Sequence, residues 1–509
     1  MELLQNEVKS AAKRGGIKVM TKELKLYING EWVDSSNPET QDILNPANQE
    51  VIAKAPRATK EETVEAIKVA KAAFESGVWA GRTPQERAKV LLQIADKMEE
   101  NLEELADLET MNNGKTKREA LSDAEESVNT FRYYAALLNN PNGVTYEASE
   151  DMQTMIVKEP MGVAGLIVPW NFPLLMSVWK IAPALATGNS IVLKPAEITP
   201  MTAVKVFELI HESDLPKGVA NLLMGSGSVV GQTIAESHDV DVVSFTGSTG
   251  VGRGIMQAAT GNLKKVNLEL GGKSPNIIFE DADLETAVDY ALFGIFMGSG
   301  QVCSSGSRVL VQESVYDEFV EKYVARAKGI KVGPGNAEGA QMGAIVSEKH
   351  MESILEYIQI GKEEGANLAL GGTRIERDGM EKGFFIEPTV FTNVTSDMRI
   401  VREEIFGPVV VIQKFKDEEE AIRIANDTEF GLAGAVFSKD HNKAMRVIKK
   451  VRAGITWVNA YHLTNVQAPW GGYKTSGIGR SVSTNALEEY QETKQININL
   501  DPKPIQFFD

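Results

Sequence analysis

The sequence is poor in the residues that build disulfides and metal sites. It contains one cysteine, Cys303, and five histidines among 509 residues. A single thiol cannot form an intrachain disulfide, which argues against a small secreted fold held by such bonds. No group of His, Cys and Asp residues has the spacing of metal ligands. We therefore expect neither a structural disulfide nor a metal centre.

Positive charge and long apolar runs are also scarce. The formal net charge is −17, whereas nucleic acids and anionic membranes attract basic surfaces. No apolar run has the length of a transmembrane helix, and the first 20 residues lack the apolar segment of a signal peptide. We predict a cytoplasmic protein that binds neither nucleic acid nor membrane.

The chain is long enough for two or three domains. Residues 1–25 are expected to form a flexible or helical extension, and residues 63–131 carry apolar side chains at helical spacing. A turn cluster at 139–143 (NNPNG) marks a candidate boundary. Residues 152–157 are predicted to form a strand, and the tail 496–500 could add an edge strand to another subunit.

From residue 162 onward, short apolar runs alternate with helical segments, which predicts an α/β fold with parallel sheets covered by helices. Such sheets bind ligands beyond the carboxyl ends of their strands. The first set of predicted strands is 163–168, 190–193, 219–224, 242–245 and 266–268, with helices at 174–186, 202–211, 229–237 and 250–259. The second set is 276–279, 307–311, 409–415, 434–437 and 454–458, with helices at 282–293, 316–326, 351–364, 418–426 and 442–450.

Cys303 lies in the loop before one of these strands, in the segment 300–306 (GQVCSSG). Small flanking residues let a substrate reach the sulfur and leave the Cys303 N–H able to face an oxyanion. This window alone leaves two interpretations open, an inert packed cysteine and a nucleophile.

Two glycine-rich segments compete for a dinucleotide phosphate. Residues 225–231 (GSGSVVG) follow a strand and open a helix, but their spacing is one residue too long for the dinucleotide fingerprint, and a tight turn explains them equally well. Residues 244–252 (SFTGSTGVG) add hydroxyl groups to a helix N-terminus, which suits a phosphate. The alternative there is a simple N-cap made by Ser248.

Polar residues also end several predicted strands. Lys194 and Glu197 could hold a ribose, with a carboxylate favouring NAD over NADP, although a surface ion pair is the alternative. Glu269 stands between leucines, where burial would raise its pKa toward that of a general base; a solvent-facing glutamate is the alternative. Asn171, between prolines, could donate to an oxyanion or simply form a turn.

Together these segments resemble the aldehyde dehydrogenase superfamily, from about residue 26 to residue 499. The motifs that stand in the family's order and spacing are PWN (169–171), KPAE (194–197), FTGST (245–249), LELGGK (268–273), GQVC (300–303) and EIFGP (404–408). The resemblance implies a Rossmann-like cofactor domain, an α/β catalytic domain and a small β oligomerisation arm. The implied boundaries are 1–25 for the extension, 26–142 and 161–270 for the cofactor domain, 271–480 for the catalytic domain, and 143–160 and 481–509 for the arm.

The resemblance also implies roles in aldehyde oxidation. Cys303 would be the nucleophile that forms a thiohemiacetal and then a thioester. Asn171 and the Cys303 N–H would hold the oxyanion, Glu269 would deprotonate the hydrolytic water, and Lys180 matches a lysine of a proton relay. The implied cofactor is NAD, with NADP as an alternative. Its implied contacts are Trp170, Lys194, Glu197, Gly227, Phe245, Gly247, Ser248, Glu404 and Phe406.

The implied partners are a small-molecule aldehyde and further copies of the chain in a homodimer or homotetramer. Trp179 and the segment 468–472 (APWGG) resemble the betaine-aldehyde and aminoaldehyde branch, whose aromatic walls suit a trimethylammonium group. Phe172 replaces a tyrosine usual there, and Met297 replaces a frequent aromatic, so a broad-specificity or retinal-type enzyme is the alternative. The implied substrate pocket comprises Phe172, Met176, Trp179, Met297 and Trp470.

Ser481 departs from the pattern, since the family commonly has glutamate there, in the relay with the lysine matched by Lys180. We hypothesise slower deacylation as a result. Two other classes remain as rivals. A thiol esterase would need an imidazole near Cys303, and a catalytically silent structural homologue would not be expected to retain Cys303, Glu269 and Asn171 together.

Overall fold

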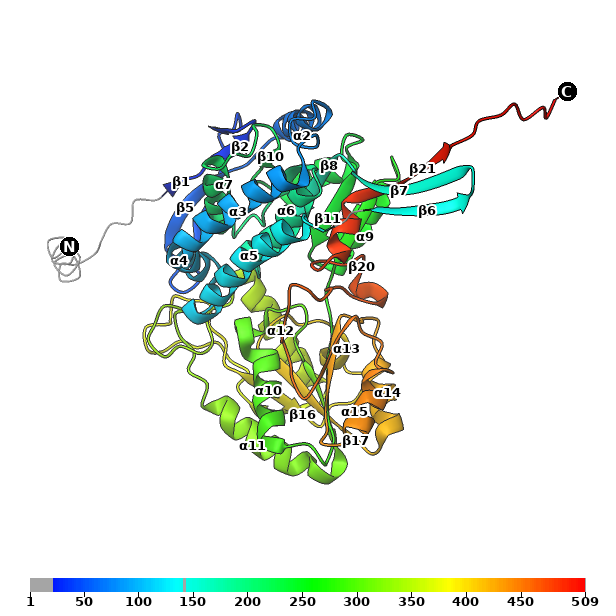
Figure 1. Cartoon of the computed structure of the whole chain (residues 1–509). Helices are drawn as coiled ribbons and strands as arrows, with labels where there is room; N and C mark the ends of the chain where they lie inside the picture. The colour runs from blue at the N-terminus through cyan, green and yellow to red at the C-terminus, as the bar shows by residue number, and fades with distance from the viewer. Residues whose placement is uncertain (1–21, 141–142, 509) are drawn as a thin grey trace.

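The structure, a computed structural model, describes residues 22–140 and 143–508. Residues 1–21 of the predicted extension and residues 141–142 of the turn cluster lie outside the described residues. The chain forms an upper lobe and a lower lobe, each built on its own β-sheet, and an arm of long strands extends from the upper lobe (Figure 1).

Helices dominate residues 60–137, as the helical spacing predicted. They are α2 (Lys60–Glu75), α3 (Pro84–Glu100), α4 (Leu102–Asn113) and α5 (Lys117–Leu137). Thr59, Thr83 and Thr116 start α2, α3 and α5 with capping boxes, in which the hydroxyl accepts the N3 amide and the N3 glutamate accepts the threonine amide. The N-terminal ends of α2, α3 and α5 are therefore fixed by local sequence.

The upper lobe contains, over the described residues, an eight-stranded sheet in the order β20-β12-β11-β8-β9-β10-β2-β3. The five strands from β12 to β10 run parallel and are mostly buried, as expected of a sheet covered on both faces. The strands are β2 (Leu26–Ile28), β3 (Glu31–Val33), β8 (Val163–Ile167), β9 (Ser190–Lys194), β10 (Ala220–Leu222), β11 (Val242–Thr246), β12 (Lys265–Glu269) and β20 (Gly477–Ile478). The connecting helices are α6 (Pro173–Ala186), α7 (Met201–His211), α8 (Gln232–Glu236), which follows a π-helical turn at Gly227–Gly231, and α9 (Thr249–Ala259).

The lower lobe contains, again over the described residues, a seven-stranded sheet in the order β15-β16-β17-β14-β13-β18-β19. All its pairings are parallel except that of β15 with β16. The strands are β13 (Pro275–Ile278), β14 (Arg308–Gln312), β15 (Asn367–Leu370), β16 (Thr389–Thr392), β17 (Val409–Phe415), β18 (Ala433–Phe437) and β19 (Ile455–Val458). The helices are α10 (Leu284–Phe296), α11 (Tyr316–Lys328), α12 (Glu348–Glu363), α13 (Arg399–Arg402), α14 (Glu418–Asn426) and α15 (His441–Ile448).

The alternation predicted from the sequence is confirmed, because every predicted strand between residues 163 and 458 occurs in one of these two sheets. After residue 163, the sequence did not predict β15, β16 and β20. β15 is exposed or half-buried along its length and antiparallel to its neighbour, and β20 has only two residues. Neither presents the apolar run that identifies a buried parallel strand.

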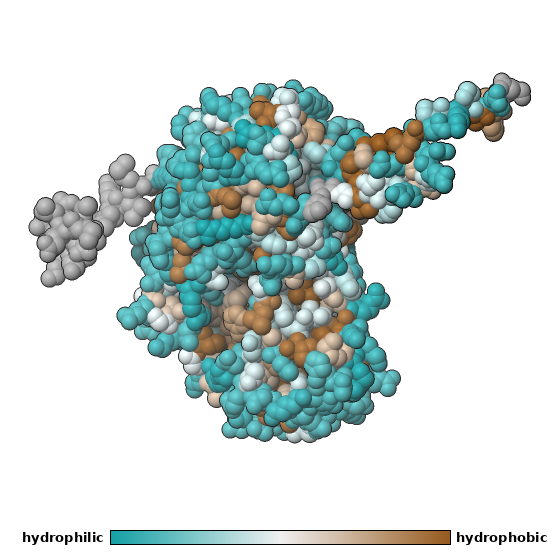
Figure 2. All heavy atoms as spheres, viewed as in Figure 1, coloured by the Kyte–Doolittle hydropathy of each residue, from teal (hydrophilic) through white to brown (hydrophobic). Residues whose placement is uncertain are grey.

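The arm is an antiparallel sheet of β6 (Gly143–Ser149), β7 (Met152–Pro160) and β21 (Gln491–Asn499), with β7 in the centre. The tail strand β21 pairs with β7 of the same chain and forms an outer edge of the sheet. Its pairing with another subunit stays a prediction. Apolar side chains lie exposed along the arm, including Val144 and Tyr146 (Figure 2).

Residues 481–490, which the sequence analysis placed in the arm, lie on the upper lobe instead. Helix α16 (Asn485–Glu489) contacts α6 and β12, and Tyr490 is buried in the upper core.

A small sheet of β1 (Lys22–Glu23), β5 (Val51–Pro56) and β4 (Thr40–Leu44) precedes α2. The division of the chain into domains stays a prediction.

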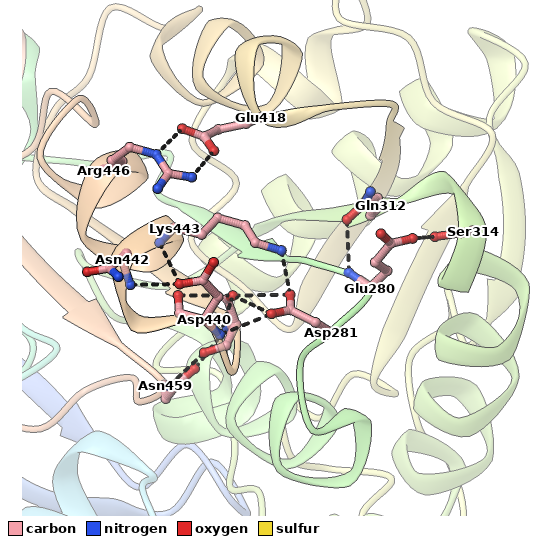
Figure 3. A network of polar contacts seen from close by, with 11 residues as sticks. Glu280, Asp281, Gln312, Ser314, Glu418, Asp440, Asn442, Lys443, Arg446 and Asn459 are labelled. Carbon is pink, nitrogen blue, oxygen red and sulfur yellow. Dashed lines mark hydrogen bonds and ion pairs between the residues drawn. The ribbon is translucent and has the colours of Figure 1, made fainter.

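A polar network in the lower lobe joins the segments that follow β13 and β18 (Figure 3). Asp281 accepts hydrogen bonds from Lys443 Nζ (2.8 Å), Ser438 Oγ (2.8 Å) and the Asp440 N–H (3.0 Å). Partial burial opposes ionisation of Asp281, but these donors outweigh it and lower its pKa to about 2. The network therefore links two strand–helix connections that are distant in the sequence.

Candidate active site

A cavity of about 380 Å³ is lined by side chains of both lobes. It brings together most of the residues that the sequence singled out. They are Asn171, Glu269 and Cys303 from the catalytic set; Trp170, Gly247, Ser248, Glu404 and Phe406 from the cofactor set; and Phe172, Met176, Trp179, Met297 and Trp470 from the substrate set. Lys180, Lys194, Glu197, Gly227 and Phe245 are not part of its lining.

The upper lobe contributes residues from the carboxyl ends of its parallel strands. Asn171 follows β8, Thr246 ends β11 and Glu269 ends β12, so all three lie at the same edge of the sheet. Asn171 is buried, and its Nδ2 donates to the Gln301 carbonyl at 2.8 Å. An amide nitrogen carries two donors, so a second N–H remains for a ligand.

Cys303 is half-buried in the loop between α10 and β14. Burial raises the pKa of its thiol to about 12, and the negative charges of Glu269 and Glu404 contribute to the increase. The N–H groups of Ser304 and of Cys303 itself hydrogen-bond the sulfur and oppose it. These surroundings therefore favour the neutral thiol over the thiolate.

Glu269 is 5% exposed. Ser481 Oγ donates to its Oε1 at 3.0 Å, whereas its Oε2 has no hydrogen-bond partner among the residues that the structure describes. Burial raises the pKa of Glu269, and the ammonium group of Lys180 limits that increase. Burial in turn lowers the pKa of Lys180, whose Nζ donates to Ser244 Oγ at 3.1 Å. A carboxyl group with a raised pKa suits a general base near neutral pH.

Aromatic rings form the cavity wall near Glu404. The centroid of the Trp170 ring lies 5.3 Å from that of Phe406 and 4.9 Å from that of His350. His350 Nε2 forms a hydrogen bond with the Phe406 carbonyl at 2.7 Å. Glu404 accepts the Gly272 N–H at 2.8 Å, and burial raises its pKa to about 7. A carboxylate beside flat rings can bind a hydroxyl-bearing group attached to a planar heterocycle.

Lys194 and Glu197 lie at the end of β9. Lys194 is buried and its Nζ donates to the Pro195 carbonyl at 2.9 Å, and burial lowers its pKa to about 8. Glu197 pairs with Arg57 at 3.2 Å, a partner that the sequence did not predict. The pair leaves further oxygen and nitrogen atoms for a ligand.

The glycine-rich loops present bare backbone to solvent. Gly247 lies against the Phe245 ring, so that a Cβ at this position would stand 2.5 Å from the ring. Ser248 caps α9 by accepting the Val251 N–H at 3.4 Å, as the N-cap interpretation predicted. Gly227 begins the π-helical turn, and a Cβ there would meet no atom within 4 Å. Both loops thus permit close approach by a ligand.

The other end of the cavity has an aromatic and apolar wall. The rings of Trp179 and Trp470 lie 5.8 Å apart in an edge-to-face arrangement. Phe172 and Met176 pack beside them. The backbone of Ser481 pairs with that of Trp470, with N–O distances of 2.7 and 2.8 Å. Ser481 therefore connects this wall to Glu269.

Two carboxylates at this end were missed in the sequence. Asp123 and Glu126, both on α5, line the cavity, and Thr464 Oγ1 donates to Glu126 at 3.4 Å. Burial raises the pKa of Glu126, an effect that Thr464 partly offsets, and burial raises that of Asp123 to about 7. A signal was available, because these acidic residues adjoin the helix face on which Ala120, Ala124 and Ser127 are buried.

An imidazole also lines the cavity, although no sequence motif predicted it. His462 Nε2 forms a hydrogen bond with the Gly294 carbonyl (3.1 Å), and its Nδ1 with Ser304 Oγ (3.3 Å). Burial lowers the pKa of His462 to about 4. Both ring nitrogens are engaged with groups other than the Cys303 thiol, which does not favour the esterase alternative.

Comparison with known proteins agrees with this geometry. The model of the aldehyde dehydrogenase family matches residues 32–496. A betaine aldehyde dehydrogenase of Bacillus subtilis is 49% identical over 484 residues, covering 95% of this chain and 99% of the relative. Retinal dehydrogenase 2 of Gallus gallus is 46% identical over 485 residues, covering 95% and 93%. A crystal structure of a Staphylococcus aureus betaine aldehyde dehydrogenase in complex with NAD+ superposes with a TM-score of 0.94 at 50% identity, covering 95% of this chain and 96% of that one.

The chain belongs to the aldehyde dehydrogenase family. The resemblance inferred from the motifs is therefore confirmed, as is the predicted α/β fold. No helix within residues 22–140 and 143–508 is long and apolar enough to cross a bilayer.

Proposed function

We propose that this enzyme oxidises an aldehyde with NAD+ through a covalent intermediate on Cys303. The Cys303 thiol releases its proton to solvent, and the resulting thiolate attacks the carbonyl carbon to give a thiohemiacetal, whose oxyanion is held by the second N–H of Asn171 Nδ2 and the Cys303 N–H. Oxidation converts this adduct into a thioester, and Glu269 removes a proton from the water that hydrolyses it to the carboxylic acid. The convergence of Cys303, Asn171 and Glu269 on one cavity carries this proposal.

The residues present fit a dinucleotide. Thr246 Oγ1 is buried in the cavity wall without a hydrogen-bond partner in the part of the chain that the structure describes, and the Gly247 backbone lies bare above a ring. Lys194 and Glu197 would hold the adenosine ribose, Ser248 the pyrophosphate, and Glu404 the second ribose, beside Trp170 and Phe406. Gly227 and Phe245 would shape the neighbouring surface. NAD+, when bound, supplies the hydride acceptor.

The carboxylate of Glu197 supports a preference for NAD+ over NADP+, because a 2′-phosphate would be repelled by it. Arg57, which pairs with Glu197, offsets part of that repulsion, so NADP+ is expected to be a weaker alternative. The ratio of kcat/KM for the two cofactors, in wild type and in Glu197→Gln, tests this. Wild type should prefer NAD+, and the variant should narrow the gap.

To test aldehyde oxidation, the protein is mixed with an aldehyde and NAD+, and the absorbance of the reduced nicotinamide is followed. Wild type should reduce NAD+, and Cys303→Ala should lose at least about 10⁴-fold in kcat, as expected when a nucleophile is removed. Release of acid from an ester without NAD+, and no reduction with it, would instead support a thiol esterase. Silence with every aldehyde would support the structural homologue.

The preferred substrate in this proposal is a cationic aldehyde such as betaine aldehyde or an aminoaldehyde. Trp179, Trp470 and Phe172 provide π faces, and Glu126 adds a carboxylate at the same end of the cavity. The names of the Bacillus subtilis and Staphylococcus aureus relatives point the same way. The second candidate is a broad-specificity or retinal-type enzyme, which the apolar side chains Met176 and Met297 and the Gallus gallus relative support.

An aldehyde panel in which charge is varied at constant size separates these two candidates. Glu126→Gln should raise KM for a trimethylammonium aldehyde about tenfold, and KM for its neutral carbon analogue by less than about twofold, because a partly buried charge pair contributes about 1–2 kcal/mol. Glu125→Gln, one residue away and exposed, is the matched control. Equal effects of Glu126→Gln on both aldehydes would favour the second candidate.

The arm supports assembly into a homodimer or homotetramer. β6 and β21 form the outer edges of its sheet, and such edges pair readily with another chain. Light scattering of wild type and of a chain ending at residue 490 would measure the subunit count.

A single cysteine, kept as a free thiol, suits the reducing cytoplasm, and fractionation of the source cells tests that location.

A further inference from the structure

The loop that leads to Cys303 has a strained backbone. Gly298, Ser299 and Gly300 have φ values of 57°, 58° and 72°, in the left-handed region. Glycine adopts this conformation freely, so the strain lies at Ser299, the residue of the three that carries a side chain. At Gly300 a Cβ would also stand 2.0 Å from the Gly407 carbonyl oxygen. Such a run persists only where surrounding contacts hold it.

Contacts from both lobes hold this run. Within the lower lobe, Ser299 Oγ donates to the Gly343 carbonyl at 2.9 Å, and Gln301 Nε2 donates to the Gly298 carbonyl at 3.1 Å. From the upper lobe, Glu119 Oε1 accepts the N–H of Gly298 at 2.8 Å. A carboxylate acceptor makes this last bond stronger than one between neutral groups. It fixes the first residue of the left-handed run.

Helix capping does not account for this contact. Glu119 closes the capping box of α5 with Oε2, which accepts the Thr116 N–H at 2.8 Å and the Thr116 hydroxyl at 2.7 Å. Glu86 closes the box of α3 in the same way, with both bonds to Thr83 at 2.8 Å. The Oε1 of Glu119 is thus available for a second role, and it reaches the nucleophile loop.

We propose that Glu119 is a positioning residue for the nucleophile. It holds the Gly298 N–H, and through the left-handed run it fixes Cys303 opposite Asn171 and Glu269. The inference rests on the proposed role of Cys303 and adds a requirement to it. A second cavity, of about 690 Å³, borders Glu119 and Gly298. When the carboxylate is removed, water from this cavity can accept the hydrogen bond of the Gly298 N–H. The variant then loses the position of Cys303 and not the hydrogen bond itself.

The test compares side chains of graded reach in the full-length enzyme. Glu119→Ala and Glu119→Asp should lower kcat about tenfold, because neither can hold Gly298 and small misplacements of reacting groups are costly. Glu119→Gln has the same length and an oxygen acceptor, so it should retain most of the activity. The Kd for NAD+, from protein fluorescence, should stay within about twofold in all three, since the effect is on the nucleophile and not on cofactor binding.

Glu86→Ala is the matched control, because it breaks an equivalent capping box that has no contact with the active site. It should lower Tm as much as Glu119→Ala does and leave kcat unchanged. A wild-type kcat in Glu119→Asp, or an equal loss of kcat in Glu86→Ala, would overturn the proposal. If Glu119→Ala does not fold, Glu119→Asp, which keeps the charge at the helix start, decides the question.

The nucleophilic role of Cys303 and the positioning role of Glu119 can be rejected independently. If Cys303→Ala retained aldehyde oxidation, the proposed function would be wrong whatever Glu119 does. If Cys303→Ala were inactive while Glu119→Asp kept the wild-type kcat, only the positioning role would be rejected. A burst of reduced nicotinamide that is slower in Glu119→Asp than in wild type would assign the loss to the steps at Cys303.

Discussion

The two sides of the cavity are held in place by different means. The upper lobe presents Asn171 and Glu269 at the ends of buried parallel strands, whose hydrogen-bonded register fixes them. The lower lobe presents Cys303 and Phe406 from loops with left-handed residues, such as Ser299 and Phe406 itself (φ 59°). The first arrangement depends on the sheet, and the second depends on individual side-chain contacts. Substitutions of the reacting groups should therefore act through lost chemistry, and substitutions of the contacts that hold the loops, such as that of Glu119 with Gly298, through lost position.

A large effect on the upper side is expected at Asn171. Asn171→Ala removes the side-chain donor to the oxyanion and should lower kcat by about 10²–10³-fold, the usual effect of losing one such donor. KM should change little. Asn112→Ala is a matched control, because Asn112 is also a buried amide of the upper lobe, bonded to the Ile198 carbonyl. Both variants should be less stable, but only Asn171→Ala should lose turnover; equal losses would contradict an oxyanion role.

A smaller effect is expected where Ser481 meets Glu269. The Ser481 hydroxyl stabilises the charged carboxylate and so holds the pKa of Glu269 below the value that burial alone would give. Ser481→Ala should therefore shift the ascending limb of the kcat–pH profile to higher pH, by about one to two units, the size of one hydrogen bond to a charged group. An unchanged or lower midpoint would show that the serine does not tune the base.

Ser481→Glu tests the hypothesis that the missing family glutamate slows deacylation. A carboxylate here would lie near both Lys180 and Glu269 and could restore the proton relay. The steady-state rate should rise a few-fold while the burst of reduced nicotinamide is unchanged, and single-turnover hydrolysis of the acyl-enzyme measures this directly. The same steady-state rate as wild type would reject the hypothesis.

The smallest effect is expected at Asp281, in the lower lobe and away from the cavity. Its pKa is lowered from 3.8 to about 2 in the folded protein, so its stabilising effect is present above pH 4 and is lost as the pH falls toward 2. Asp281→Asn should lower the free energy of unfolding by less than about 1 kcal/mol, since the group is only partly buried and solvent screens its contacts. Thermal unfolding at pH 6 should show the difference, and the difference should vanish in acid. A change in kcat would contradict the assignment of a purely structural role.

The contrast between the two sides also explains what the sequence could predict. Apolar runs alternating with helical segments predicted both sheets, and the strand-end rule then directed attention to Asn171, Lys194 and Glu269. No such rule applies to loops. Cys303 attracted attention as the sole cysteine, but Glu404 and Phe406 were identified only through the family resemblance.

Other features could not be obtained from the sequence because they depend on contacts between distant segments. His462 reaches the cavity from the lower lobe, and its local sequence carries no distinguishing signal. Glu126 reaches it from the upper lobe, and its local sequence shows only that it adjoins the buried face of α5. The bond between Glu119 and Gly298 joins residues that a capping-box pattern and a glycine-rich loop explain separately. The position of Ser481 was noted in the sequence, but its bond to Glu269 required the fold.

The central claim is that Cys303 and Glu269 act in succession on one substrate carbon. The most direct measurement mixes Glu269→Gln with aldehyde and NAD+, stops the reaction with acid and determines the mass of the Cys303 peptide. We expect the acyl group to accumulate on Cys303, with a normal burst and a steady-state rate about 10²–10⁴-fold below wild type, the range for loss of a general base. A variant that turns over at the wild-type rate, or an unmodified Cys303 after the burst, would contradict the account.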